Sequence, residues 1–299
     1  MTTIKTEEHE TMIDLHTHST KSDGTLTPKE LVRLAKELGV EAIALTDHDT
    51  VSGLEEAQEE GARIGVEAAP GIELSTNHEG MEVHILGYYI NRRNAEFMHN
   101  LREFVEERER RNQKMAKLLQ QEGFGVTMEN LWQEYPKSII TRAHFARYLV
   151  DHGFVKDRDT VFQEYLGEGC RCYVPRKKIT PFEAISLIRL GEGVPFFAHP
   201  VLCRMADEAL YSFTKQLKEA GLAGIEAIYS MNEPEDERKL CQMAEKLGLL
   251  ISGGSDFHGK NKPHIQLGAG RGGLQVPYQY LEDIKKWRRA HIKPQASRD

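Results

Sequence analysis

The chain has 299 residues, 39% hydrophobic and 28% charged, with a formal net charge of −7 at pH 7. This composition is typical of a folded globular protein with a large core, and 299 residues fit a single α/β barrel. The acidic balance excludes a broad surface for nucleic acid or anionic membranes, so an anionic substrate must be attracted locally, by metals or a few cationic side chains. No apolar run is long enough to span a membrane, residues 1–10 lack an apolar signal region, and the scattered cysteines lack paired metal-site spacing. We therefore expect a cytoplasmic protein with reduced thiols.

The first predicted strand, residues 12–18, alternates polar and apolar side chains. A strand has a side-chain period of two, so Asp14, His16 and His18 should point to one face, opposite the apolar Ile13 and Leu15. Polar side chains that converge on a buried face are costly without a partner, and a divalent metal is a suitable one. The loop that follows contributes the carboxylate of Asp23. This stretch therefore predicts one part of a metal site.

The rest of the barrel portion alternates short apolar runs with amphipathic segments. Helices are expected to start at Thr27-Pro28 and Thr180-Pro181, where Thr can cap the helix and Pro suits its first turn. Further strands are predicted at 40–46, 66–72, 81–89, 194–198, 224–229 and 249–252, and further helices at 53–64, 205–220, 234–247 and 277–290. Seven strands interleaved with helices predict a parallel barrel or a doubly wound sheet.

Residues 95–172 interrupt this alternation with helical segments alone. We predict a helical insertion, a cap domain over 95–172, within a catalytic barrel domain made of 11–94 and 173–299. The run of charges over 106–111 has both signs alternating, which is typical of a solvated helix face.

Polar residues also follow the other predicted strands, where the carboxyl ends of parallel strands form one rim. They are Asp47, His48, Glu73, His199, Asp256 and His258, with His84 inside its strand. Histidine and carboxylate ligands without cysteine favour catalytic Mn²⁺, Fe²⁺ or Zn²⁺, and their number suits two or three ions.

The order of these motifs resembles that of the PHP (polymerase and histidinol phosphatase) metallophosphoesterases. The segments that carry the resemblance are Asp14 to His18, Thr46 to Asp49, Gly71 to Glu73, His199-Pro200 and Ser255 to Gly259. Within the family the sequence is most similar to the 3′,5′-nucleotide bisphosphate phosphatases and the related 5′-to-3′ exoribonuclease. The resemblance implies a distorted seven-stranded (β/α) barrel with a helical insertion and three metal ions, with Mn²⁺ favoured.

The resemblance also implies a role for each matching residue. His16, His18, Glu73 and Asp256 would hold the first metal; Glu73, His84 and His199 the second; and Asp23, His48 and His258 the third. A metal-bound hydroxide would attack phosphorus, with Asp256 and His258 belonging to the catalytic centre as well. Asp14 and Asp47 would either support the ligands from behind or carry protons near the leaving oxygen.

Three groups of basic residues are candidate substrate contacts. Arg142 and His144 follow Thr141 at a predicted helix N-terminus, where backbone amides favour anions, although a capped surface helix is the alternative. Arg204 follows His199-Pro200, although the family's commoner His-Pro-Gly-Arg-Tyr is absent here. Residues 176–178 (Arg-Lys-Lys) could face the rim or form a solvated turn.

The sequence therefore predicts a metal-dependent phosphoesterase that acts on a nucleotide or a short oligonucleotide. Two alternatives stay open: a phosphatase of histidinol phosphate or another small molecule, and a non-catalytic metal-binding interaction module.

Overall fold

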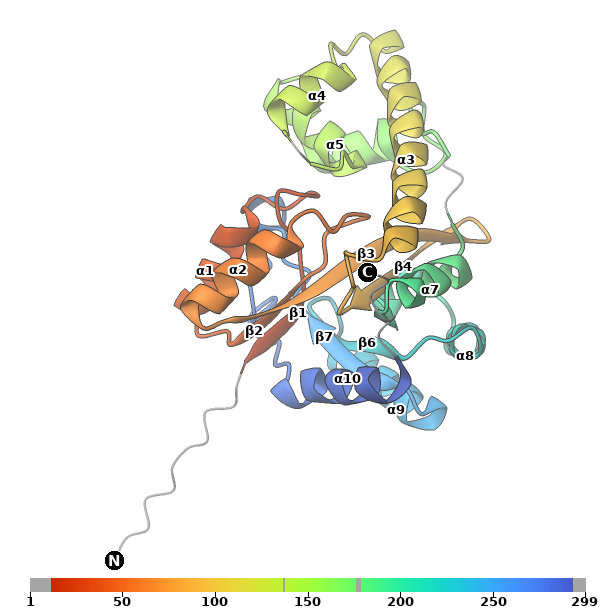
Figure 1. Ribbon diagram of the computed structural model, residues 1–299. Helices are drawn as coiled ribbons and strands as arrows, with labels where there is room; N and C mark the ends of the chain where they lie inside the picture. Colours follow the sequence, from red (N-terminus) through yellow and green to blue (C-terminus); the bar gives the residue numbers. More distant parts are fainter. Residues whose placement is uncertain (1–11, 137, 176–178, 293–299) are drawn as a thin grey trace, which may run out of the picture.

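The computed structural model describes residues 12–136, 138–175 and 179–292. Seven strands form one sheet whose spatial order follows the sequence, and β7 returns to β1, so the barrel is nearly closed (Figure 1). The strands are β1 (Ile13–Thr17), β2 (Ala42–Leu45), β3 (Glu67–His78), β4 (Met81–Tyr88), β5 (Val194–Phe197), β6 (Gly224–Tyr229) and β7 (Leu250–Gly254). The predicted distorted seven-stranded barrel is confirmed.

One strand runs against the predicted direction. β4 pairs antiparallel with both β3 and β5, whereas the other described pairs are parallel. Only Glu79 and Gly80 separate β3 from β4, and both have positive φ (51° and 90°). A connection this short can only make a hairpin, because a parallel pair needs a crossover of about a dozen residues. The expectation of a rim made only of parallel strands was therefore wrong at β4.

Ten α-helices lie in the described ranges, and none there is both long and apolar enough to cross a membrane. Thr27 and Thr180 cap α1 and α7 through capping boxes, as their sequence predicts. The helices are α1 (Pro28–Glu37), α2 (Leu54–Ile64), α3 (Ala95–Gln121), α4 (Met128–Glu134), α5 (Arg142–Asp151), α6 (Arg158–Val161), α7 (Pro181–Leu190), α8 (Asp207–Glu219), α9 (Pro234–Leu247) and α10 (Tyr278–His291).

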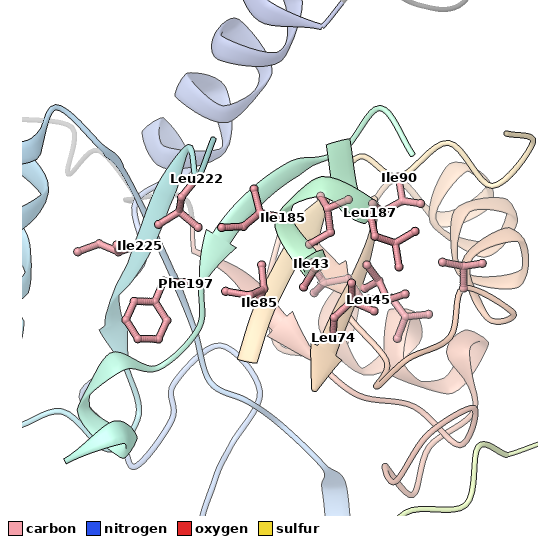
Figure 2. Close-up of a cluster of buried hydrophobic side chains, with 14 of the residues drawn as sticks. Ile43, Leu45, Leu74, Ile85, Ile90, Ile185, Leu187, Phe197, Leu222 and Ile225 are labelled. Carbon is pink, nitrogen blue, oxygen red and sulfur yellow. The ribbon is translucent and has the colours of Figure 1, made fainter. Parts of the chain in front are cut away.

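Alternate residues of the barrel strands enter two different cores, because neighbouring side chains of a barrel strand point outward and inward. On β2, Ile43 and Leu45 pack with residues of the covering helices in the outer core, where Ile185 of α7 also lies (Figure 2). Ala42 and Ala44 pack in the second core, which α10 joins through Leu281 and Ile284. The strands are thus held rigidly from both faces.

The stretch between β4 and β5 carries a third core of its own. Figure 1 shows α3 extending from the barrel, with α4 and α5 against its far half. Met115 and Leu119 of α3 pack there against residues of α4 and α5, whereas Phe97 and Leu101 belong to the outer barrel core. One helix of 27 residues therefore contributes to both bodies.

The charged segment of α3 is not a solvated face throughout. Arg108 and Arg111 are only 5% and 8% exposed, while Glu107 and Arg110 pair with each other at the surface. Arg108 and Arg111 are three residues apart and therefore lie on the same face of the helix, which is the buried face. The prediction of a solvated charge run was wrong for these two arginines.

Candidate metal centre

The N-terminal strand brings two histidines to the centre but separates them from Asp14. The register of β1 against β2 shifts between Asp14 and Thr17, and such an irregularity breaks the regular alternation of side chains. The carboxylate of Asp14 instead accepts hydrogen bonds from the Ser255 amide (2.9 Å) and hydroxyl and from the Gly268 amide (2.8 Å). The expectation of one shared face was therefore wrong for Asp14, which holds the turn after β7 in place.

Asp47 has a comparable position behind the centre. Its side-chain oxygens accept hydrogen bonds from the amide and hydroxyl of Ser19 (2.8 and 2.6 Å) and from the hydroxyl of Ser22 (2.6 Å). These contacts fix the loop that carries Asp23. With Asp47 only 1% exposed, this geometry favours support of a ligand loop over proton transfer to a leaving group.

Glu73 lies at the middle of the centre, with histidines from different strands around it. Its Oε2 atom is 3.2 Å from Nε2 of both His16 and His18 and 3.1 Å from Nδ1 of His48. Its Oε1 atom is 2.7 Å from Nδ1 of His84 and 2.9 Å from Nε2 of His199. One carboxylate thus belongs to two of the residue groups that could hold a metal ion.

The remaining two carboxylates complete the arrangement. Asp256 Oδ1 is 3.3 Å from His18 Nε2 and 3.7 Å from His16 Nε2, and Asp23 Oδ1 is 3.2 Å from His258 Nε2. The structure brings all nine predicted ligands into four overlapping groups: His18, Asp23, His48 and His258; His16, Glu73 and His199; His16, His18 and Asp256; and His48, Glu73 and His84.

These residues fit a divalent metal by their spacing and by their unsatisfied atoms. Ligand atoms about 2.1 Å from one ion, at right angles to each other, lie about 3.0 Å apart, close to the separations here. Five buried atoms make no hydrogen bond: Nε2 of His16, Nε2 of His18, Nδ1 of His48, Oδ1 of Asp23 and Oε2 of Glu73. Such atoms are costly to bury without a partner, and a cation satisfies them together.

In the absence of metal, neighbouring charges keep the three carboxylates of the cluster ionised and His18 and His84 protonated at neutral pH. Burial works to raise the pKa of Glu73, Asp23 and Asp256, but the neighbouring histidines, and for Asp256 also Lys262, hold all three pKa values well below the ordinary range. Burial works to lower the pKa of His18 and His84, but the adjacent carboxylates raise both to about 9. The carboxylates are therefore ionised, and metals would displace protons from these two imidazoles.

Three supporting residues were missed in the sequence. Glu226 on β6 is fully buried, and it accepts from His16 Nδ1 (2.9 Å) and from the His199 amide (2.7 Å). The Tyr229 hydroxyl donates to Asp256 Oδ2 at 3.0 Å, and Lys262 Nζ lies 2.6 Å from the same oxygen. A carboxylate on the second nitrogen of a ligand histidine fixes its tautomer. Glu226 could have been found from the sequence, because it is an acidic residue inside the apolar run of β6.

A cavity of about 240 Å³ joins the metal ligands to the insertion. Asp23, His48 and His84 line its barrel side, and Arg108, Arg111 and Arg142 line the side of α3 and α5. Arg108 also donates to the buried Asp49 and to the hydroxyl of Ser75 (3.2 Å), which ties α3 to the barrel. Three guanidinium groups beside the ligands can contact an anionic substrate despite the net negative charge of the chain.

The predicted substrate contacts have different positions. Arg142 lines this cavity, whereas His144 is 4% exposed and its Nδ1 accepts from the Thr141 amide (3.0 Å). His144 therefore caps α5, and its contact with substrate stays a prediction. Arg204 is exposed at the end of a 3₁₀ turn (Pro200–Cys203) and is absent from the cavity lining in the described ranges. Residues 176–178 lie outside the described residues.

Comparison with known proteins identifies relatives over most of the chain. A family model described as the PHP domain matches residues 14–174. The chain is 36% identical to a 3′,5′-nucleoside bisphosphate phosphatase from Chromobacterium violaceum, covering 82% of this chain and 87% of that protein. It is 34% identical to a 5′-3′ exoribonuclease from Haemophilus influenzae, covering 82% and 89%, and to the exoribonuclease Rnm of Escherichia coli, covering 85% and 87%.

Solved structures resemble the fold as well. A metal-dependent phosphoesterase structure from Bifidobacterium adolescentis superposes with a TM-score of 0.81 at 30% identity, covering 92% of this chain and 95% of that one. A Chromobacterium violaceum structure described as an amidohydrolase, with bound sulfate and no metal, has a TM-score of 0.77 at 35% identity, covering 82% and 87%. The fold is thus shared with these two structures over most of the chain.

Proposed function

The chain belongs to the PHP family and is a metal-dependent phosphoester hydrolase, and from this premise we propose that it removes phosphate from small nucleotides. The substrates that we propose are 3′,5′-bisphosphate nucleotides or the 5′ ends of short oligoribonucleotides. The relatives named for these two activities support this class. The observation that carries the proposal is the cavity between the metal ligands and three arginines.

The size and charge of the cavity support a substrate with two phosphates. A volume of about 240 Å³ is below that of a complete small-molecule site, so it suits a phosphate and part of a sugar, with the base outside. We propose that the scissile phosphate lies at the ligand wall, near His48 and His84. Arg142 would then bind the second phosphate, since a guanidinium matches phosphate geometry with paired hydrogen bonds.

We propose that the nine ligand residues hold three ions, with Mn²⁺ favoured. Four overlapping groups in which His16, His18, His48 and Glu73 recur support more than one ion. When bound, divalent ions lower the pKa of water towards neutrality and neutralise charge on phosphoryl oxygens. The supporting residues would orient the ligands: Asp14 the turn carrying Asp256 and His258, Asp47 the loop of Asp23, and Glu226 the ring of His16. We also propose that residues 95–172 act as the cap that closes this cavity.

An activity assay across substrate classes tests the function. The purified protein with Mn²⁺ is incubated with a 3′,5′-bisphosphate nucleotide, a 5′-mononucleotide, a short 5′-phosphorylated RNA and histidinol phosphate. We expect the highest kcat/KM on the bisphosphate or the RNA. Preference for histidinol phosphate would assign the small-molecule alternative, and absence of turnover on every substrate would favour a non-catalytic module.

A pair of arginine variants tests the second-phosphate site. Arg142→Ala should raise KM for the bisphosphate about tenfold or more, since it removes a charge-assisted contact, while leaving KM for the mononucleotide nearly unchanged. Arg147→Ala on the same helix is the matched control, because Arg147 pairs with Asp151 and is absent from the cavity lining. Equal effects of Arg142→Ala on both substrates would contradict the assignment.

A further inference from the structure

Glu82 connects the metal centre to the insertion, although sequence reasoning gave it no role. It lies on β4 two residues before His84, so both side chains lie on the same face of the strand. Both also line the cavity that contains the arginines. The two carboxylate oxygens of Glu82 have different partners: Oε1 lies 3.2 Å from His84 Nε2, and Oε2 accepts from Arg142 Nη2 at 2.6 Å.

The contact with His84 selects which nitrogen of the ring can bind a metal. His84 Nδ1 faces Glu73, at 2.7 Å from Oε1, and therefore points into the group of ligands. An imidazole that presents a lone pair on Nδ1 carries its proton on Nε2, and a carboxylate at Nε2 stabilises that tautomer. Glu82 thus contacts the second ring nitrogen of His84, just as the buried Glu226 contacts the second ring nitrogen of His16.

The contact with Arg142 holds the guanidinium at the cavity wall. Arg142 belongs to α5 in the insertion, and its guanidinium also lies over the ring of Tyr173, 5.9 Å from the centroid. Two anchors fix a long side chain that would otherwise sample many rotamers, so less entropy is lost when it binds an anion. The Glu82 carboxylate is thus shared between a metal ligand and an anion-binding residue.

We propose that Glu82 is a positioning residue that fixes the Nδ1-binding tautomer of His84 and sets the place of Arg142 for the second phosphate. The part concerning Arg142 rests on the proposed function, whereas the part concerning His84 rests on the ligand geometry alone. This side chain therefore contacts both the insertion and the metal centre.

Glu82→Gln tests both parts with two separate measurements. His84 and Arg142 contact different carboxylate oxygens of Glu82, and an amide keeps only one of these two acceptors. Calorimetric titration with Mn²⁺ in the absence of substrate should show one class of site weakened about tenfold or more, the range for partners of ligand histidines. KM for the 3′,5′-bisphosphate nucleotide should rise severalfold. In the double variant with Arg142→Ala, the two KM effects should fall short of additivity.

The controls separate positioning from a general effect of charge. Glu79→Gln, at the exposed tip of the same hairpin, removes the same charge away from the cavity and should leave both measurements at wild-type values. Arg142→Ala should leave the Mn²⁺ titration unchanged. Wild-type Mn²⁺ affinity in Glu82→Gln, with KM unchanged or lowered, would overturn the proposal. If the wild-type enzyme hydrolyses no nucleotide, the proposed function fails, while the Mn²⁺ titration still decides on the role of Glu82 at His84.

Discussion

Loss of one partner of the buried ion pair between Asp49 and Arg108 should strongly destabilise the junction between barrel and insertion. The side chains are 0% and 7% exposed, and the Asp49 carboxylate also accepts from the Ser75 amide at 3.0 Å. Replacing Arg108 with Met keeps the length of the side chain but leaves a buried carboxylate without this cation. Removal of one partner of a buried pair costs about 3–5 kcal/mol of unfolding free energy.

The measurement is urea denaturation of Arg108→Met, Asp49→Asn and the double variant, with metals removed by chelation so that ligand binding does not contribute. Arg108→Met should lower the free energy of unfolding by about 3–5 kcal/mol. The double variant should lose about 0.5–3 kcal/mol less than the sum of the single variants, because the uncompensated charge is gone. A loss below about 1 kcal/mol for Arg108→Met, in the range of exposed pairs, would refute the reasoning.

Three further predictions concern the metal centre. The carboxylates that raise the pKa of His18 and His84 to about 9 stabilise the metal-free fold below pH 6.5, and this stabilisation is lost as pH rises through 9. Mn²⁺ affinity should therefore increase from pH 7 to 9, with release of protons on binding, measured by calorimetry in buffers of different ionisation enthalpy. Glu226→Gln should weaken Mn²⁺ binding about 10- to 100-fold, and unchanged affinity would contradict its support of His16. Gly254→Ala should cost about 1–3 kcal/mol in thermal unfolding and weaken Mn²⁺ binding, because its methyl group would lie 2.4 Å from His16; a stable variant with normal affinity would show that β1 can shift.

The sequence predicted the strands and the polar residues that gather at the centre because both depend on local patterns. Strand ends and polar residues stand in a fixed relation in α/β barrels, so Glu73 and His199 could be placed at the rim without knowledge of the pairing. Asp14 was misplaced since a register shift in β1 is decided by packing between strands, which periodicity does not contain. The direction of β4 was predictable in principle, because Glu79 and Gly80 leave no room for a crossover.

Residues that act through long-range contacts were harder to predict. Arg108 and Arg111 lie in a run of alternating charges that also suits a solvated helix, and only the docking of α3 decides which charges are buried. Lys262 and Tyr229 meet at Asp256 from separate segments, so neither has a local signature. His144 looked like a basic residue at a helix start, yet its accepting Nδ1 makes it a cap.

The shared helix α3 has a mechanical consequence for the whole chain. It spans about 40 Å at 1.5 Å per residue, with Phe97 and Phe104 in the barrel core and Met115 and Leu119 in the core of the insertion. Bending a continuous helix is harder than rotating about a loop, so the connection from the barrel into the insertion is rigid. Because α3 contributes to both cores, unfolding of either body disturbs a helix against which the other body packs. A truncation at residue 95 would therefore open the barrel core that the first turns of this helix close.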